Sequence, residues 1–276
     1  MCPTGTGVSI RERGFFDDEL YNKILAEVKG MKMGIRFIRW GEPMLHPRLI
    51  DYIAQAKADG HLVHMNTNAT MLDEIMIKKL LDAGLDSIKF SFQGVDAKSY
   101  GEMRQGANFK QVVSNIAKMY EMRGNSLTPY MHISTTTTYE NETDIAKFKT
   151  EMAKICDFIT VGQTLLDYID TEKTRLDASL KQKLTELKTK QQITRARFVN
   201  PPCLAGEFCV NWNGICSCNF DYDYNHVIGD LREQTIREIY NGEKMHEHFV
   251  QVRDGIEKIP YCSIRCWDYM NLQASK

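Results

Sequence analysis

The sequence has almost no net charge and no long apolar segment. Its 35 lysine and arginine residues nearly balance 36 aspartate and glutamate residues, for a formal charge of −1. This balance gives no electrostatic reason to expect nucleic acid or an anionic membrane surface as a partner. No apolar run approaches the roughly 20 residues that a membrane span requires. We therefore expect neither a nucleic-acid-binding protein nor a membrane protein.

The chain also lacks a recognisable leader, internal repeats and low-complexity tracts. No positively charged segment followed by an apolar stretch opens it, so we expect no signal peptide and a cytoplasmic location. Disulfides are rare in that reducing compartment. The eight cysteines are therefore expected to serve a metal site rather than a disulfide framework.

Helical and strand patterns alternate from residue 15 to about residue 170. Apolar and β-branched runs predict five strands, at residues 34–40, 62–67, 87–92, 130–136 and 158–161. Strands that alternate with helices predict a parallel sheet with right-handed crossovers. The amino-acid composition changes at Pro201-Pro202, where a short region begins that is rich in cysteine and aromatic residues. We therefore expect two domains, residues 1–198 and 199–276.

Polar residues follow three successive predicted strands. Gly41-Glu42-Pro43 follows the first, Asn66-Thr67-Asn68 ends the second, and Ser91-Phe92-Gln93-Gly94 ends the third. The carboxyl ends of parallel strands meet at one edge of the sheet, where active sites gather. Each stretch alone is equally compatible with an ordinary turn. Together they predict a cofactor site.

Other residues in this region have both functional and ordinary interpretations. Arg104 precedes a predicted helix and is either a carboxylate clamp or a surface arginine. Cys156 is predicted to be a small buried hydrophobe. Four polar residues are candidate substrate contacts, although none distinguishes a sugar from a peptide, and no acid or base is assigned: His132, Thr135, Gln163 and Thr164.

Six of the eight cysteines lie in the last third of the chain. The four with the most suitable spacing for a shared metal centre are Cys203, Cys218, Cys262 and Cys266. Four thiolates from two distant segments can bind zinc or an iron–sulfur cluster. A zinc ribbon prefers two C-x2-C pairs, which this chain lacks. Cys209 and Cys216 are alternates, and Cys216 competes with Cys218 because both lie on one face of an expected strand.

The strand-end segments Gly41-Glu42-Pro43, Asn66-Thr67-Asn68 and Ser91-Phe92-Gln93-Gly94, followed by Arg104, resemble in this order the radical S-adenosylmethionine (SAM) enzymes. The C-terminal cysteine pattern resembles the SPASM or shorter twitch extension of that superfamily, and the resemblance covers essentially the whole chain. It implies an α/β fold, a partial (β/α)6 TIM-like barrel that here lacks its first strand. Cys2 resembles the third cysteine of the C-x3-C-x2-C loop that binds a [4Fe–4S] cluster.

The resemblance also implies cofactors and chemistry. Glu42 and its neighbours would contact the amino group of SAM, Ser91 its ribose and Arg104 its carboxylate. The full set of implied cofactor-binding residues is Gly41, Glu42, Pro43, Asn66, Asn68, Ser91, Gln93 and Arg104. An electron, from a donor such as flavodoxin or ferredoxin, would cleave SAM to a 5′-deoxyadenosyl radical that abstracts hydrogen from a substrate. One auxiliary [4Fe–4S] cluster would occupy the C-terminal cysteines.

Three functional hypotheses follow. The first is an oxidoreductase-type radical SAM enzyme that oxidises or rearranges a small molecule of the sugar or aminocyclitol type. The second is a maturase that modifies a peptide or protein. The third is a non-catalytic metal-binding protein, which applies if the natural chain is this short. Because one thiolate cannot anchor the radical cluster, we expect the chain as given to be inactive.

Metal analysis tests these expectations. After anaerobic reconstitution, iron and sulfide assays should find about one cluster per chain, because four cysteines can ligate one. No SAM cleavage should accompany it. Zinc without acid-labile sulfide would refute the assignment.

Overall fold

The computed structural model describes residues 12–38, 40–104, 106–164, 166, 170–172, 176–195, 207–217, 224 and 226–254. The chain forms two compact units. Unit 1 contains Val28–Thr164, and unit 2 combines Cys2–Glu27 with Leu165–Lys276.

Unit 1 contains a parallel five-stranded sheet. Its strands are β1 (Gly34–Phe37), β2 (Leu62–Thr67), β3 (Ser87–Ser91), β4 (Tyr130–Thr137) and β5 (Phe158–Gln163). They pair in sequence order, β1-β2-β3-β4-β5, and every pair is parallel. Each connection is therefore a crossover, and all five carboxyl ends lie at the same edge.

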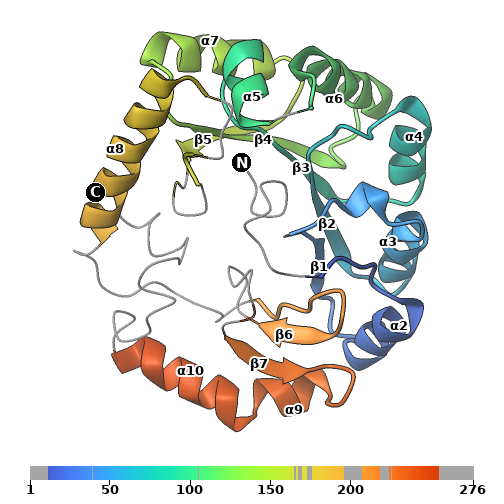
Figure 1. The fold of residues 1–276 in the computed structure, drawn as a ribbon. Helices are drawn as coiled ribbons and strands as arrows, with labels where there is room; N and C mark the ends of the chain where they lie inside the picture. Colours follow the sequence, from blue (N-terminus) through green and yellow to red (C-terminus); the bar gives the residue numbers. More distant parts are fainter. Residues whose placement is uncertain are drawn as a thin grey trace. The chain divides into compact units, whose positions relative to one another are not determined.

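Helices cover one face of this sheet (Figure 1). They are α3 (Leu49–Ala58), α4 (Glu74–Asp82), α5 (Ala97–Met103), α6 (Phe109–Arg123) and α7 (Glu142–Met152). Asparagine or aspartate side chains accept backbone N–H groups at the starts of four of them: Asp73, Asp96, Asn108 and Asn141. These caps satisfy N–H groups that a helix start leaves without partners.

Alternate strand residues build the core of unit 1. Met65, Ile88, Phe90, Met131 and Ile133 are fully buried, each with 0% exposure. Their neighbours along each strand are polar and only half-buried, for example in the sequence Ser87-Ile88-Lys89-Phe90-Ser91. Successive strand residues point to opposite faces. The apolar face therefore packs under the helices, and a polar face lies opposite.

Unit 2 contains a small two-stranded sheet and four helices in its described residues. The strands β6 (Ile215–Ser217) and β7 (Val227–Asp230) are antiparallel. The helices are α2 (Asp18–Glu27), α8 (Ala178–Arg195), α9 (Ile236–Tyr240) and α10 (Glu243–Asp254). Leu20 of α2 shares one buried apolar cluster with Cys216, Ile228, Leu231 and Ile239.

Polar contacts also attach α2 to this unit. The Lys23 ammonium donates to the carbonyls of Leu231 (2.6 Å) and Gln234 (2.8 Å). Glu27 accepts the backbone N–H of Ile236, at the start of α9, at 2.5 Å. A carboxylate at that position also complements the helix dipole. Residues 18–27 therefore belong to the core of unit 2 by both apolar and polar contacts.

All five predicted strands are confirmed; their first residues agree with the prediction, and their last residues differ by at most three. The α/β class with a parallel sheet is also confirmed. The expected domain boundary at residue 198 stays a prediction, because the observed grouping follows contacts and joins α2 to the C-terminal region. The sequence pattern did not anticipate α5, α9 or α10; α5 and α9 have only seven and five residues, and nothing in the structure explains why α10 was missed.

None of the helices in the described part of the chain combines the length and apolar character needed to span a bilayer.

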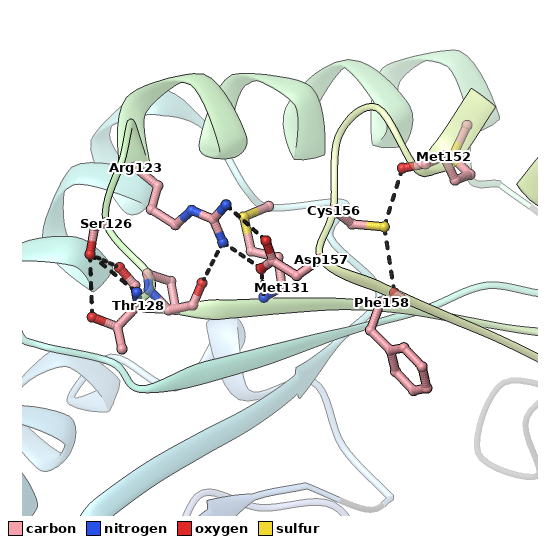
Figure 2. Close-up of polar contacts among 9 residues, drawn as sticks. Arg123, Ser126, Thr128, Met131, Met152, Cys156, Asp157 and Phe158 are labelled. Carbon is pink, nitrogen blue, oxygen red and sulfur yellow. Dashed lines mark hydrogen bonds and ion pairs between the residues drawn. The ribbon is translucent and has the colours of Figure 1, made fainter. Parts of the chain in front are cut away.

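An ion pair closes the amino end of the sheet between β4 and β5 (Figure 2). The guanidinium of Arg123 contacts both carboxylate oxygens of Asp157, at 2.5 and 3.0 Å, and the carbonyl of Pro129 at 3.1 Å. Asp157 also accepts the N–H of Met131 at 2.7 Å. Burial opposes ionisation of Asp157, but these hydrogen bonds outweigh it and lower the pKa of the carboxyl.

Asp157→Asn should destabilise the protein by about 1.5–3 kcal/mol at neutral pH, the range for a hydrogen bond to a charged group. The folded pKa lies below the unfolded value of about 3.9, so the stabilisation is complete above that pH. It is lost as the pH falls through the folded pKa. Urea unfolding at pH 7 and pH 3 measures the difference, which should shrink in acid.

Asp82→Asn is the matched control, because Asp82 pairs with Lys78 along α4 at an exposed site, with side chains 63% and 70% exposed. Its cost should stay below about 0.5 kcal/mol. Equal costs for the two variants, or a difference that is independent of pH, would contradict the structural role of Asp157.

Candidate functional site

The carboxyl ends of β1 and β2 are joined through Glu42. Its carboxylate accepts hydrogen bonds from the Thr67 hydroxyl (2.7 Å), the Asn68 N–H (2.8 Å) and the Met44 N–H (3.3 Å). The last contact caps the short 3-10 helix η1 (Pro43–Leu45), in which Pro43 occupies the first turn. Proline fits there because that position needs no N–H donor.

Glu42 retains room for one more hydrogen-bond donor. One oxygen accepts two hydrogen bonds, and the oxygen that faces Asn68 accepts one. An ionised carboxylate has about four acceptor positions. Burial raises the pKa of Glu42, while its hydrogen bonds and the positive charge of Arg104 act in the opposite direction. The structure therefore brings Arg104 within electrostatic reach of Glu42.

Arg104 ends helix α5, and its backbone N–H donates to the Tyr100 carbonyl at 2.8 Å. Its side chain is half-buried. Asn66 and Asn68 have separate local partners. The Asn66 oxygen lies 2.8 Å from Nε2 of His64, and the Asn68 oxygen accepts the N–H and hydroxyl of Thr70. Asn66 is thus held by a contact within β2, and Asn68 holds the loop after it in shape.

Ser91 and Gln93 lie at the end of β3 and in the turn beyond it, and both are half-buried. Gly94 holds this turn. Its φ is +79°, and an added Cβ would lie 2.5 Å from the Ser99 hydroxyl and 2.7 Å from the Ser99 backbone. Only glycine satisfies both conditions. At Gly41, in contrast, an added Cβ would meet nothing within 4 Å.

The four candidate substrate contacts fall into different environments. His132 lies on the polar face and Gln163 is exposed. Thr135 is 1% exposed, and its hydroxyl donates to the Gly94 carbonyl at 2.5 Å on the helix-covered face. Thr164 is 3% exposed and bonds to Thr136 and Thr138. Thr135 and Thr164 are therefore structural, contrary to the expectation, because the strand alternation turns Thr135 inward.

Sequence reasoning also missed residues that the fold brings to this edge or this face. The sequence places Thr67 at a strand end and gives it no role of its own, whereas in the structure its hydroxyl donates to Glu42 and positions that carboxylate. His64 and Lys89 lie on the polar face beside His132. The positive charge of Lys89 contributes to lowering the pKa of both histidines. A polar residue at every second position of an apolar strand was the available signal.

Most of the predicted metal ligands lie outside the described residues: Cys2, Cys203, Cys218, Cys262 and Cys266. Cys216 and Cys209 are described, and neither forms a disulfide. Cys216 is fully buried in the apolar cluster, and burial, with the nearby Asp230 and Cys209, raises its pKa to about 12. The parts of the chain that the structure describes contain no cluster of three or more potential metal ligands.

The expected competition between Cys216 and Cys218 assumed a regular strand. The register between β6 and β7 shifts between Cys216 and Ser217, and both residues are buried. Such a bulge interrupts the alternation of side chains. Cys218 lies outside the described residues, so the expectation that Cys216 and Cys218 share a face stays a prediction. Cys156 is buried as expected, between the carbonyls of Met152 and Phe158 (Figure 2).

Two family models match this chain, one over the region that contains strands β1–β4 and one over the C-terminal region. The family model described as the radical SAM superfamily matches residues 1–150, more than half of the chain. The chain belongs to the radical SAM superfamily. A second model, SPASM, described as an iron-sulfur cluster-binding domain, matches residues 203–267 of this radical SAM protein.

Curated relatives match only part of their length. The tungsten-containing aldehyde ferredoxin oxidoreductase cofactor-modifying protein of Pyrococcus furiosus is 37% identical over 83 residues, which cover 29% of this chain and 23% of the relative. The GTP 3',8-cyclase of Chlorobaculum tepidum is 34% identical over 95 residues, 33% of this chain and 28% of the relative. The matches thus span about a quarter of these relatives.

Two solved structures share the fold along most of this chain. BtrN in complex with AdoMet and 2-DOIA has a TM-score of 0.55 and 14% identity, covering 93% of this chain and 82% of BtrN. Streptococcus suis SuiB bound to the precursor peptide SuiA has a TM-score of 0.62 and 13% identity, covering 90% of this chain and 63% of SuiB. At these identities the likeness concerns the fold alone.

Membership implies a [4Fe–4S] cluster and SAM as cofactors, and the SPASM match implies an auxiliary iron–sulfur cluster. The described residues fit SAM at its methionyl end, which carries an ammonium and a carboxylate. Glu42 has an acceptor position for the ammonium, and Arg104 supplies the opposite charge.

The two glycines of the site motifs provide a matched test of the strand-end geometry. Gly94→Ala should lower stability by about 1–2 kcal/mol or more, because it combines a left-handed backbone with a steric overlap. Gly41→Ala should change stability by less than about 0.5 kcal/mol, since its Cβ meets open space. Thermal melting of both variants measures this. A larger loss for Gly41→Ala would show that the loop is built differently.

Proposed function

We propose that the carboxyl edge of the unit 1 sheet is the SAM site of a radical SAM enzyme, which uses SAM to remove a hydrogen atom from a substrate. The observation that supports this most directly is the remaining acceptor position of Glu42, together with an Arg104 charge that favours the ionised form of this carboxyl. A zwitterionic amino-acid group needs both charges within one site. Radical SAM membership supplies the identity of that group.

Each residue then has a definite task. Glu42 accepts the ammonium of SAM, and Thr67 and the Asn68 N–H hold its carboxylate in place. Arg104 binds the carboxylate of SAM. Ser91 and Gln93, at the end of β3, contact the ribose, and Gly94 sets the path of that turn. When bound, SAM and its cluster supply the one-electron chemistry that the protein side chains cannot provide.

The same proposal assigns the metal ligands. Cys2 binds the radical cluster, and the auxiliary cluster is held by Cys203, Cys218, Cys262 and Cys266. Cys218 is preferred over Cys216, because the Cys216 thiol points into an apolar cluster and resists ionisation. Metal ligation requires the thiolate. A small electron-transfer protein such as flavodoxin or ferredoxin supplies the electron.

A small molecule of the sugar or aminocyclitol type is our first choice of substrate. The fold likeness to BtrN, which was solved with 2-DOIA and is covered over 82% of its length, supports it. A peptide is the second candidate, supported by the likeness to SuiB bound to its precursor peptide.

Equilibrium dialysis of the anaerobically reconstituted protein with radiolabelled SAM tests the proposal. Glu42→Gln and Arg104→Met should each raise the Kd for SAM about 10-fold or more, since each removes a charge-assisted hydrogen bond.

Glu121→Gln and Arg48→Met are matched surface controls, because Glu121 and Arg48 form exposed ion pairs with Lys118 and Asp51. They should bind SAM as the unmodified protein does. Unchanged SAM affinity in both site variants, or no binding by the unmodified protein, would contradict the proposal.

A further inference from the structure

The loop that follows β2 holds Glu42, and side chains in turn hold the backbone of this loop. The Asn68 N–H donates to the Glu42 carboxylate at 2.8 Å, and the Ala69 N–H donates to the Thr67 hydroxyl oxygen at 3.0 Å. The Thr70 N–H donates to the Asn68 side-chain oxygen at 2.9 Å. The Thr67 hydroxyl itself donates to Glu42 at 2.7 Å. The position of the Glu42 carboxylate therefore depends on the path of this loop.

Ala69 has a backbone conformation that residues with a Cβ rarely adopt. Its φ is +58°, in the left-handed region, and its exposed fraction is 0%. Among the residues that the structure describes, it is the only fully buried non-glycine residue with a positive φ. The Cβ crowds the following carbonyl in this region, so the conformation costs free energy that the surroundings must offset. Contacts around Ald69 must therefore hold it.

Asn115, on α6, binds the carbonyl of Ala69. Its Nδ2 donates to that carbonyl at 3.1 Å, while its Oδ1 accepts from Nε2 of Gln111, one turn earlier on the same helix, at 2.8 Å. Because a carbonyl only accepts, the amide nitrogen is the atom that faces the loop, and the Gln111 contact favours that orientation. The Leu72 N–H lies farther from the same carbonyl, at 3.4 Å.

The N–H and the carbonyl of Ala69 belong to the peptide groups on the two sides of its Cα. Rotation about φ or ψ would move one of these groups relative to the other. The hydrogen bonds to Thr67 and from Asn115 therefore restrain both angles together. They link α6, in the helical layer, to the carboxylate at the carboxyl edge of the sheet.

We propose that Asn115 is a positioning residue of the SAM site: it holds Ala69 in the left-handed conformation and thereby keeps the two loop donors of Glu42 in place. Those donors are the Thr67 hydroxyl and the Asn68 N–H. The inference rests on the proposed function, which assigns the ammonium of SAM to Glu42. Asn115 acts through Ala69, since its two hydrogen bonds go to Gln111 and to that carbonyl.

The ionisation of Glu42 is the property that this arrangement controls. Burial raises the pKa of Glu42, whereas hydrogen bonds from Asn68, Thr67 and Met44 and the charge of Arg104 lower it. Weaker loop donors would leave the effect of burial less opposed, and the pKa would rise further. A protonated carboxyl attracts an ammonium less strongly, so SAM binding would weaken first at acidic pH. Arg104 stays charged throughout this range.

Asn115→Leu removes the donor and keeps a side chain of similar size. Equilibrium dialysis of the anaerobically reconstituted protein with radiolabelled SAM, from about pH 8 to about pH 5, measures the effect. The Kd at the upper end should rise about 3-fold, the order expected for groups coupled in one hydrogen-bond network. The pH at which affinity begins to fall should also move upward. Unchanged affinity, or a loss that is equal at every pH, would overturn the proposal.

Gln182→Leu is the matched control, because Gln182 is also a helical amide with a hydrogen bond one turn along its helix, to Glu186 at 3.1 Å. It should leave both the Kd for SAM and its pH dependence unchanged.

Ala69→Gly supplies an independent test, since glycine adopts the left-handed conformation without a Cβ penalty. The loss of SAM affinity that Asn115→Leu causes should be smaller when it is combined with Ala69→Gly than when it is made alone. Equal losses in the two backgrounds would show that Asn115 does not act through the conformation of Ala69, and would overturn the proposal.

Circular dichroism and thermal melting establish whether each variant folds. If Asn115→Leu does not fold, Gln111→Leu replaces it, because Gln111 is exposed and supplies the contact that orients Asn115. It should raise the Kd about 2-fold, by the same coupling. Unchanged SAM affinity in that variant would then count against the proposal in the same way.

The inference and the proposed function fail separately. Absence of SAM binding by the unmodified protein contradicts the proposed function, and the inference with it. Weakened binding in Glu42→Gln, together with normal affinity and a normal pH profile in Asn115→Leu, leaves the proposed function in place and overturns this inference alone.

Discussion

The in-register pairing of five parallel strands determines where the polar strand residues of unit 1 lie. Parallel hydrogen bonding fixes which residues are neighbours across strands, and the alternation of side chains assigns each to one of two faces. The helix-covered face takes the apolar residues, such as Met65, Ile88 and Ile133. A slip of one residue in β3 would bury Lys89, and the same slip in β4 would bury His132; either would expose core residues. The same constraint therefore protects the core and keeps the polar strand residues on the opposite face.

The two ends of the sheet use carboxylates differently. At the amino end, Asp86 accepts the Val63 N–H and pairs with Lys57, while Asp157 accepts the Met131 N–H and pairs with Arg123. Each of these two carboxylates accepts three hydrogen bonds, two of them from a cationic side chain. At the carboxyl end, Glu42 also accepts three hydrogen bonds, but all three donors are neutral groups. A carboxylate paired with a protein cation stabilises the sheet, whereas one that accepts only from neutral donors can still bind a cationic group of a ligand.

Unit 2 shows how a region with little periodicity acquires a core. Its two short strands and α9 contribute few large apolar residues, and α2 supplies Leu20 from the other end of the chain. Lys23 and Glu27 then satisfy backbone groups around the start of α9. Small domains bury little apolar surface on their own, so a helix recruited from far along the chain adds stability that local sequence cannot provide.

The sequence by itself determined the strands of unit 1, their parallel arrangement and the family, because apolar periodicity and strand-end motifs are local signals. The assignment of Glu42, Ser91 and Arg104 to a SAM site comes from the same local signals and stays a prediction. Only the tertiary structure decided that Thr67 positions Glu42, that Thr135 is structural, and that Lys89 lies between Asn66 and His132. These relations depend on register between strands more than 20 residues apart in the sequence. The place of α2 in unit 2 likewise depends on contacts between Leu20 and residues beyond 210, which no local pattern records.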